Sequence, residues 1–228
     1  MKVEKIFEGV FRIGKHIATR NLVPGKKVYG EKTVVIDGAE YRIWEPERSK
    51  VCAAILNGLR CFPIREGSKV LYLGAATGTT CSHLSDIVKH KGVIYSVEFS
   101  PRVFREFVAL AESRRNLIPI LADARKPADY FWVESVDVVY CDIAQPDEVD
   151  IAMRNADEFL KEGGYMMIAI KSRSIDVTKE PKEIYALERK KLTEHGFETV
   201  ELVELDPYER DHATVSYTHL TLPTTERV

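Results

Sequence analysis

The stretch Val70-Leu71-Tyr72-Leu73-Gly74-Ala75-Ala76-Thr77-Gly78 decides the fold that the sequence predicts. Its first four residues form a continuous apolar run, which is typical of a strand buried on both faces of a parallel sheet. Small residues follow from Gly74 to Gly78, and a helical pattern of apolar side chains begins at Thr79. A strand, a glycine-containing loop and a helix in this order predict the first unit of an α/β sheet.

Four more apolar runs follow, and each is separated from the next by a stretch long enough for a helix. They cover residues 93–97, 117–121, 136–141 and 165–170. Pro101 and Pro146 suit the first turn of a helix, and Gly196 suits the end of a helix over residues 181–195. Five strand–helix units in series predict a doubly wound, Rossmann-like α/β sheet over residues 46–215.

The two ends of the chain have different patterns. Residues 1–45 predict a small antiparallel β domain, with one hairpin of residues 4–13 and 15–19 and another of residues 33–36 and 39–43. The second hairpin turns at Asp37-Gly38, a pair that suits a type I′ turn. Residues 216–228 show weak strand alternation and then a proline and a threonine cluster. We interpret them as an atypical, non-native tail and exclude them from functional argument.

The composition is that of a globular protein, with 45% hydrophobic and 30% charged residues in a chain of 228. No apolar run approaches the roughly 20 residues that cross a bilayer. No apolar segment follows the N-terminal Met-Lys-Val-Glu-Lys, so we expect a cytoplasmic protein with no membrane partner. The four cysteines and six histidines have no zinc-binding spacing, so no metal site is predicted.

Charge is spread unevenly along the chain. The net charge is −2, yet residues 1–45 hold nine Lys and Arg against six Asp and Glu. Phosphate binding depends on Lys and Arg, so a chain of this charge is poorly suited to hold a polyanion alone. If the substrate is a nucleic acid, we expect partner proteins to supply much of the binding.

Each predicted strand of the larger domain ends on a glycine or a charged residue. These are Gly74, Glu98, Asp123, Asp142 and Lys171. In open α/β sheets, ligands bind beyond the carboxyl ends of the strands. The sequence therefore predicts a binding site at this edge.

The loop after the first strand indicates which kind of ligand binds there. It runs from Gly74 through Ala75, Ala76, Thr77 and Gly78 to Thr79 and Thr80. Its small residues let a ligand approach the backbone closely. It is neither Gly-x-Gly-x-x-Gly nor a Walker loop, so a ligand without phosphate, such as S-adenosylmethionine, fits it better than a nicotinamide dinucleotide. A purely structural glycine-rich turn is the alternative.

Three acidic strand ends have distinct expected roles. Glu98 is placed to accept hydrogen bonds from the ribose hydroxyls of an adenosine, and Asp123 to reach the adenine amino group. Asp142 and Lys171 end neighbouring strands, where a carboxylate can orient a lysine or tune its pKa. Such a lysine can take the proton of a hydroxyl that is methylated. The alternatives are solvated strand ends and a simple strand-end salt bridge.

Seven segments of the chain, in order, resemble the fibrillarin family, and the resemblance covers nearly everything up to Val215. They are residues 41–50, 72–80, 97–100, 122–125, 141–146, 170–176 and 205–212. The resemblance implies cofactor contacts at Thr79, Thr80, Glu98, Phe99, Asp123, Ala124, Asp142, Ile143, Ala144 and Gln145. It also implies a catalytic group of Lys50, Asp142, Lys171 and His212. Lys171 is then the base, Asp142 orients it, and Lys50 and His212 hold or polarise the target ribose.

The resemblance further implies the reaction and the partners. Fibrillarins transfer a methyl group from S-adenosylmethionine to ribose 2′-hydroxyls of ribosomal RNA, and in some cases of transfer RNA. They work with a box C/D guide RNA, a Nop-type scaffold protein and a kink-turn-binding protein. The chain has no Gly/Arg-rich N-terminal segment, so the archaeal form is expected. The rival hypotheses are a non-catalytic scaffold subunit, a nicotinamide-dependent oxidoreductase, and a methyltransferase for small molecules or proteins.

Overall fold

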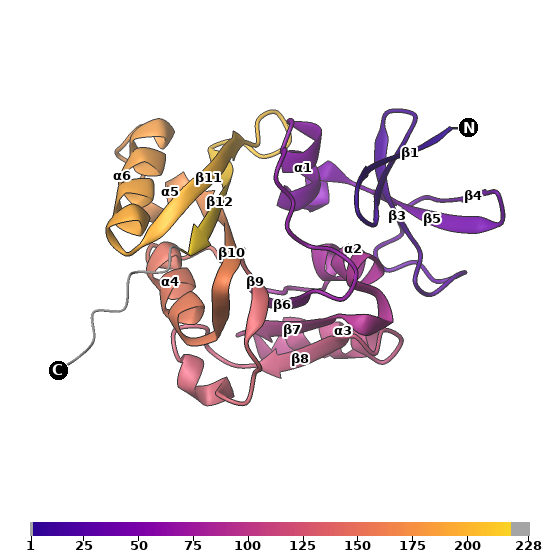
Figure 1. Ribbon diagram of the computed structural model, residues 1–228, viewed down its shortest axis with the longest axis horizontal. Helices are drawn as coiled ribbons and strands as arrows, with labels where there is room; N and C mark the ends of the chain where they lie inside the picture. The colour runs from indigo at the N-terminus through magenta and orange to yellow at the C-terminus, as the bar shows by residue number, and fades with distance from the viewer. Residues whose placement is uncertain (1, 220–228) are drawn as a thin grey trace.

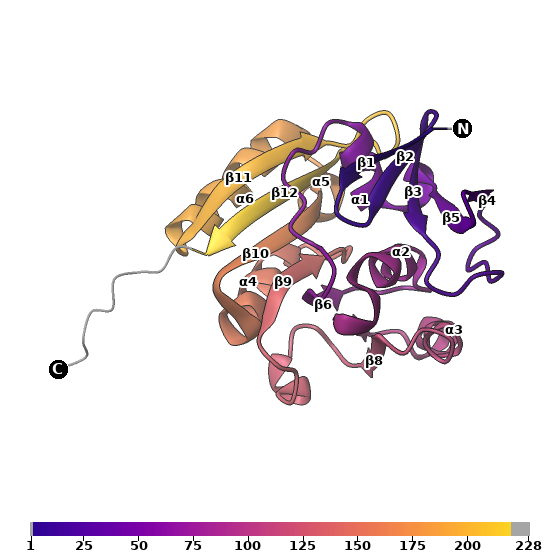
Figure 2. The ribbon, with the colours of Figure 1, turned by 45° about the vertical axis from the view of Figure 1, so that its right-hand side comes forward.

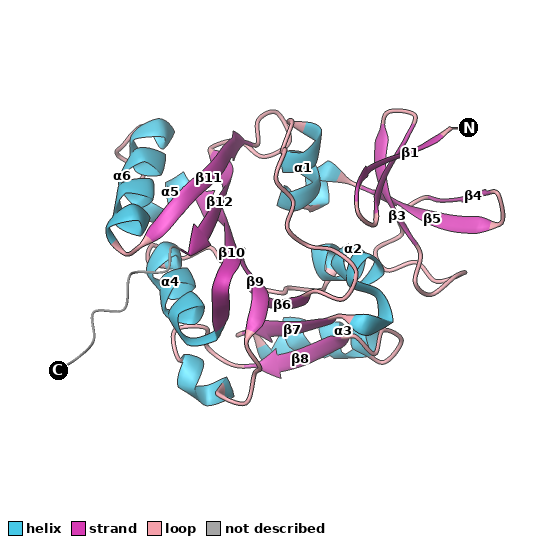
Figure 3. Cartoon of the chain, viewed as in Figure 1, coloured by secondary structure: helices cyan, strands magenta, loops and turns pink. Residues whose placement is uncertain are grey.

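The structure is a computed structural model that describes residues 2–219. It contains a five-stranded and a seven-stranded sheet, the second flanked by helices (Figures 1 and 3). The strands are β1 (Val3–Phe7), β2 (Val10–Ile13), β3 (His16–Arg20), β4 (Thr33–Ile36), β5 (Ala39–Trp44), β6 (Lys69–Leu73), β7 (Val93–Glu98), β8 (Leu117–Leu121), β9 (Val136–Cys141), β10 (Leu160–Lys171), β11 (Phe197–Glu204) and β12 (His212–His219). The helices are α1 (Lys50–Leu56), α2 (Thr79–Val88), α3 (Pro101–Ala111), α4 (Glu148–Phe159), α5 (Ser172–Ile175) and α6 (Pro181–Glu194), with short 3₁₀ turns at Pro46–Arg48, Lys89–Lys91 and Pro127–Tyr130.

The N-terminal domain is the predicted antiparallel sheet, with the strand order β1-β2-β3-β5-β4. The β4–β5 turn is confirmed, because Asp37 and Gly38 have φ values of 50° and 74°, both positive as a type I′ turn requires. The prediction of one strand over residues 4–13 is wrong. The chain turns back at Gly9, whose φ is 74°, and β1 pairs with β2.

The larger sheet has the order β11-β12-β10-β9-β6-β7-β8, and the predicted strands β6 to β10 form its parallel part. Strands β11 and β12 were not predicted. They form an antiparallel hairpin that adds to β10 through β12. β11 is largely half-buried or exposed, so it lacks the continuous apolar run that marks the central strands.

Helices cover both faces of this sheet (Figure 2). Leu71 and Leu73 belong to a core with α4 and α6, whereas Val70 and Tyr72 belong to a core with α1, α2 and α3. Successive side chains of a strand point to opposite faces, so a strand covered on both sides must be apolar at every position. This arrangement is the physical reason for the continuous apolar runs.

A buried polar network joins the two domains. Arg42 of β5 bonds Glu31 at 2.6 Å and Asp86 of α2 at 2.9 Å, and Arg114 bonds Asp86 at 2.6 Å. Burial raises the pKa of Glu31, but the Tyr29 backbone N–H and the Arg42 guanidinium outweigh burial and leave that pKa below its ordinary value. The positive charges of two arginines and the negative charges of two carboxylates therefore cancel in the buried region between the domains.

The boundary predicted at residue 215 is wrong. Strand β12 continues to His219, and Ser216 and Tyr217 are buried and paired with both β10 and β11. The first residues of the expected tail thus complete the sheet, because β11 needs a partner along its whole length. Residues 220–228 lie outside the described residues, and so does their interpretation as non-native.

Candidate active site

The predicted strand ends lie at one edge of the sheet. Leu73 is in register with Val97 of β7 and with Cys141 of β9, so Gly74, Glu98 and Asp142 follow at the same level. At the end of β10, Lys171 is paired with His212, the first residue of β12. Residues from Gly74 to His212, which are more than a hundred positions apart in the sequence, therefore lie side by side along one edge of the sheet.

Neighbouring atoms lie so close to the loop after β6 that it needs small residues. Gly74 has a φ of 84°, and a Cβ atom there would lie 2.5 Å from the backbone oxygen of Asp142. A Cβ atom on Gly78, which caps α2, would lie 2.4 Å from Leu110. Both positions therefore require glycine. Ala75 is buried beside them, and the buried Thr80 donates a hydrogen bond from its hydroxyl to Ser49 at 2.9 Å.

A cavity of about 110 Å³ opens beside this loop. Of the predicted cofactor residues, those that line it are Gly74, Glu98, Phe99, Asp123, Ala124, Ile143 and Gln145. The remaining ones are Ala75, Ala76, Gly78, Thr79 and Thr80 in the loop itself, Asp142 beyond it, and the exposed Ala144. The cavity thus offers the carboxylates of Glu98 and Asp123 beside small and apolar side chains, with Arg125 and Gln145 also in its lining. Phe99, which is 71% exposed, adds an aromatic surface.

Backbone hydrogen bonds hold the Glu98 carboxylate in place. One oxygen accepts from the Ala76 N–H at 2.9 Å and the other from the Ser100 N–H at 2.8 Å. Each carboxylate oxygen has a second lone pair, so this group can still accept hydrogen bonds from a ligand. The cavity, its acids and the close-packed glycine fit the adenosine part of S-adenosylmethionine.

Arg125 holds the far wall of the cavity, a role that we did not predict from the sequence. Its guanidinium bonds Asp147 at 2.7 Å and the side-chain oxygen of Gln145 at 2.9 Å. Its backbone N–H also donates to Asp123 at 2.9 Å. The only sequence signal was its position directly after Asp123 and Ala124.

Three of the four predicted catalytic side chains meet at one atom. The Lys50 and Lys171 ammonium groups lie 3.3 Å and 3.2 Å from the same oxygen of Asp142, and all three side chains are about 15% exposed. Lys50 is the first residue of α1, in the segment that joins the two domains. A simple strand-end pair would need only one lysine. The convergence of two cations on one carboxylate indicates a built site.

Glu209 links this cluster to His212 and was missed by the sequence reasoning. Its carboxylate lies 3.8 Å from the Lys50 ammonium and 3.9 Å from His212 Nδ1. His212 Nδ1 also lies 2.6 Å from the backbone oxygen of Arg210, and because a carbonyl oxygen can only accept, Nδ1 is assigned as the donor. A continuous chain of ionisable side chains therefore runs from Lys171 to His212.

Glu148 holds the backbone of Lys171 through a hydrogen bond. It is fully buried in the first turn of α4, and its carboxylate accepts the Lys171 backbone N–H at 2.8 Å. Burial raises the pKa of Glu148 to about 8. An acidic residue in a first helical turn is common on surfaces, so the sequence contained no signal for this role.

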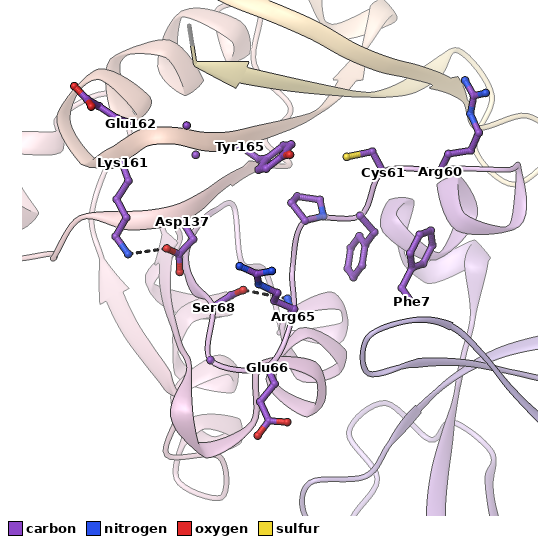
Figure 4. Close-up of a pocket in the computed structure, with 15 residues that line it drawn as sticks. Phe7, Arg60, Cys61, Arg65, Glu66, Ser68, Asp137, Lys161, Glu162 and Tyr165 are labelled. Atoms are coloured by element: carbon purple, nitrogen blue, oxygen red, sulfur yellow. Dashed lines mark hydrogen bonds and ion pairs between the residues drawn. The ribbon is translucent and has the colours of Figure 1, made fainter. Parts of the chain in front are cut away.

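The opposite edge of the sheet holds none of the candidate residues. A hollow of about 690 Å³ lies there, and Phe62 is among its lining residues. Figure 4 shows Arg65, Tyr165 and Lys161 around it, and Lys161 bonds Asp137 at 2.6 Å. Within residues 2–219, no group of three His, Cys, Asp or Glu side chains is arranged to hold a metal ion. No helix in the same range combines the length and apolarity needed to cross a membrane.

The fold and the site define a class of protein. An S-adenosylmethionine-dependent O-methyltransferase from Thermotoga maritima, 15% identical, superposes with a TM-score of 0.57 over 94% of this chain and 86% of its own. That likeness concerns the fold alone. The seven-stranded sheet is the methyltransferase sheet, and its ligand edge carries the cavity and the charged cluster.

The particular family is fibrillarin. The fibrillarin family model matches residues 1–220, and this chain belongs to that family. A Methanopyrus kandleri protein named fibrillarin-like rRNA/tRNA 2′-O-methyltransferase is 56% identical over 93% of this chain and 92% of its own. Fibrillarin from Aeropyrum pernix, solved with natively bound S-adenosyl-L-methionine, is 48% identical with a TM-score of 0.87 over 95% of this chain and 98% of its own. Fibrillarin solved in a complex with Nop5p is 42% identical with a TM-score of 0.87 over 96% of this chain and the whole of its own.

Proposed function

We propose that this chain is an S-adenosylmethionine-dependent methyltransferase that modifies ribose 2′-hydroxyls of ribosomal RNA, and also of transfer RNA. The observation that carries the proposal is the Lys50–Asp142–Lys171 cluster beside the cavity lined by Gly74, Glu98 and Asp123. Relatives with this fold are named rRNA/tRNA 2′-O-methyltransferases, and one is described with natively bound S-adenosyl-L-methionine.

The cofactor supplies a methyl group on a sulfonium sulfur, and the chain supplies its position. Of the residues that line the cavity, Glu98 would hold the ribose hydroxyls of the adenosine, Asp123 would contact its adenine, and the exposed Phe99 would cover it. Alignment of the reacting atoms accounts for much of the acceleration in such a transfer. The rigid loop at Gly74 and the fixed carboxylate of Glu98 provide that alignment.

The charged cluster manages the proton of the target hydroxyl. In this proposal the Lys171 ammonium, which lies 3.2 Å from Asp142, first loses a proton to water. The resulting amine would accept the proton of the 2′-hydroxyl as the 2′-oxygen takes the methyl group, and the ammonium paired with Asp142 would be restored. A positioned base of this kind contributes roughly 10²–10⁴-fold. Lys50 stays as a cation beside Asp142, and His212 Nε2 accepts a hydrogen bond from the ribose.

The proposed partners are inferred from the same relatives and from the net charge of the chain. A relative is solved in a complex with Nop5p, so a Nop-type scaffold protein binds this chain as well. A box C/D guide RNA and a kink-turn-binding protein complete the proposed particle. With a net charge of −2, the chain relies on them for sequence specificity and for part of the affinity. A cytoplasmic location stays a prediction.

The assay of the assembled particle tests this function. The particle is reconstituted with a guide RNA, and transfer of labelled methyl to a complementary RNA is measured for the wild type, Lys171→Ala and Lys161→Ala. We expect Lys171→Ala to lose 10²-fold or more of the rate. The control Lys161→Ala, which changes an exposed lysine at the opposite edge, should keep it.

The outcomes separate the rival hypotheses. A wild type without activity would favour a non-catalytic scaffold subunit. An unchanged rate in Lys171→Ala would remove the proposed base and leave the enzyme class intact. Binding of NAD without binding of S-adenosylhomocysteine, measured by titration calorimetry, would favour an oxidoreductase.

A further inference from the structure

A groove lies between the N-terminal domain and α3, outside the cofactor cavity. Its volume is about 760 Å³. One wall is the segment from Lys26 to Tyr29, which connects β3 to β4, and the other is the C-terminal half of α3. Thr79 of the cofactor loop and Arg48 also line it. Arg48 precedes Lys50 by two residues, and Thr80, next to Thr79, hydrogen-bonds Ser49 at 2.9 Å. The groove therefore borders the segment that leads into Lys50.

The cations of this groove are available to a ligand. Lys26 and Lys27 are exposed, and within the described residues neither ammonium lies within 4.0 Å of a carboxylate. Arg48 is 55% exposed and lies over the Tyr29 ring, 5.6 Å from its centroid. A weak pair with Glu45 at 3.5 Å is the only ion pair of Arg48 in this part of the chain.

The lysine wall is rigid although it contains no helix or strand. The fully buried Glu31 accepts the backbone N–H groups of Val28 and Tyr29 at 3.0 Å and 2.9 Å. The Asn21 side chain donates to the backbone oxygen of Lys26 at 3.1 Å. Glu31 is in turn held by Arg42 at 2.6 Å, in the network between the domains. The lysines therefore extend from a fixed backbone, which lowers the entropy lost on binding.

The opposite wall shows which part of the groove an anion can use. α3 contributes Glu106, and Glu112 follows at the end of that helix. These carboxylates repel a phosphate from that side and direct it to the lysine wall and to Arg48. A polyanion would thus be guided from the N-terminal domain toward Lys50.

We propose that this groove binds the phosphodiester backbone of the RNA duplex formed by guide and target, next to the modified ribose. The inference rests on the proposed function and deepens it, since it assigns RNA binding to the N-terminal β domain. Contacts to phosphates position a nucleic acid without reading its sequence. This suits an enzyme whose specificity comes from base pairing.

Salt dependence of RNA binding tests the proposal. The full chain is titrated into a fluorescein-labelled 12-base-pair RNA duplex of guide and target sequence, and fluorescence anisotropy is followed at several salt concentrations. Each lost phosphate contact lowers the slope of log K against log salt by roughly 0.7–0.9. For Lys26→Ala with Lys27→Ala we expect a slope lower by about 1.4–1.8, which corresponds to roughly 25–60-fold weaker binding at 0.1 M salt.

Matched variants show that the effect belongs to this groove. Lys89→Ala with Lys91→Ala removes the same charge from the opposite edge of the sheet and should keep the wild-type slope. Lys26→Arg with Lys27→Arg should restore it. In the assembled particle, the groove variant should raise KM for RNA and leave kcat within about twofold.

Three results would overturn the proposal. The first is a slope of log K against log salt in the Lys26→Ala, Lys27→Ala variant equal to that of the wild type. The second is no salt-dependent RNA binding by the wild type. The third is a groove variant that binds RNA normally but no longer binds the scaffold protein. The last would assign the groove to an acidic protein segment. An inactive wild-type particle would instead contradict the proposed function, whatever the slope.

Discussion

Replacing Asp86 by Asn should weaken the joint between the two domains. Asp86 is 3% exposed and bonds Arg42 at 2.9 Å and Arg114 at 2.6 Å, and it also accepts the Thr19 hydroxyl at 2.7 Å. Asparagine has the same shape but no charge. Glu31 would remain as the carboxylate partner of Arg42, whereas Arg114 would lose Asp86, its only carboxylate partner among the described residues.

The magnitude follows from the burial of these groups. Removing one member of a buried ion network leaves an uncompensated charge and costs about 3–5 kcal/mol. For a chain of this size, each kcal/mol lowers Tm by roughly 2–4 °C. We therefore expect Asp86→Asn to lower Tm by roughly 6–20 °C.

Thermal and denaturant unfolding followed by circular dichroism measure this effect. The matched control is Asp157→Asn, which changes a carboxylate that is 47% exposed and paired with His195. The control should change the free energy of unfolding by no more than about 0.5 kcal/mol. A loss below about 1 kcal/mol in Asp86→Asn would refute the reasoning that this network holds the domains together.

Three further predictions concern the site itself. Glu98→Gln should weaken binding of S-adenosylhomocysteine by about 10–100-fold in titration calorimetry, since hydrogen bonds to a charged group contribute about 1.5–3 kcal/mol; unchanged affinity would contradict the ribose contact. The pKa of Glu148, about 8 in the folded chain, lies above its unfolded value, so its stabilisation is complete at low pH and is lost as pH rises toward 8. Between pH 6 and 8 the wild type should therefore lose about 2 kcal/mol relative to Glu148→Gln, and parallel pH profiles in urea unfolding would refute this. Gly74→Ala should abolish cofactor binding and lower Tm because its Cβ would meet the Asp142 backbone oxygen at 2.5 Å, whereas Gly163→Ala, with a φ of 69° and open space, should cost only backbone strain. Equal Tm losses in the two glycine variants would show that the contact is unimportant.

The parallel sheet and its ligand edge followed from local pattern. A strand buried on both faces must be apolar throughout, so β6 to β9 were predictable from their runs alone. The polar residues that end such strands share one edge, so Gly74, Glu98 and Asp142 could be grouped from the order of residues in the chain. The structure has a cavity beside Gly74 at that edge.

Side chains whose roles depend on distant partners were not predictable in this way. Lys50 could be assigned only by resemblance, because nothing near it in sequence shows that its ammonium reaches Asp142 at 3.3 Å. Glu209 and Glu148 resemble ordinary surface acids until packing places one between Lys50 and His212 and buries the other under Lys171.

By itself the sequence determined the strands β6 to β10 in their order along the chain, the edge at which we predict ligand binding, and the family. These depend on the period of apolar residues and on short motifs, which are local properties of the chain. Only the tertiary structure decided that β12 extends to His219, that Glu31 and Asp86 are buried together, and that Lys26 and Lys27 line a groove with α3. Burial and charge pairing arise between segments far apart along the chain, and no local pattern specifies them.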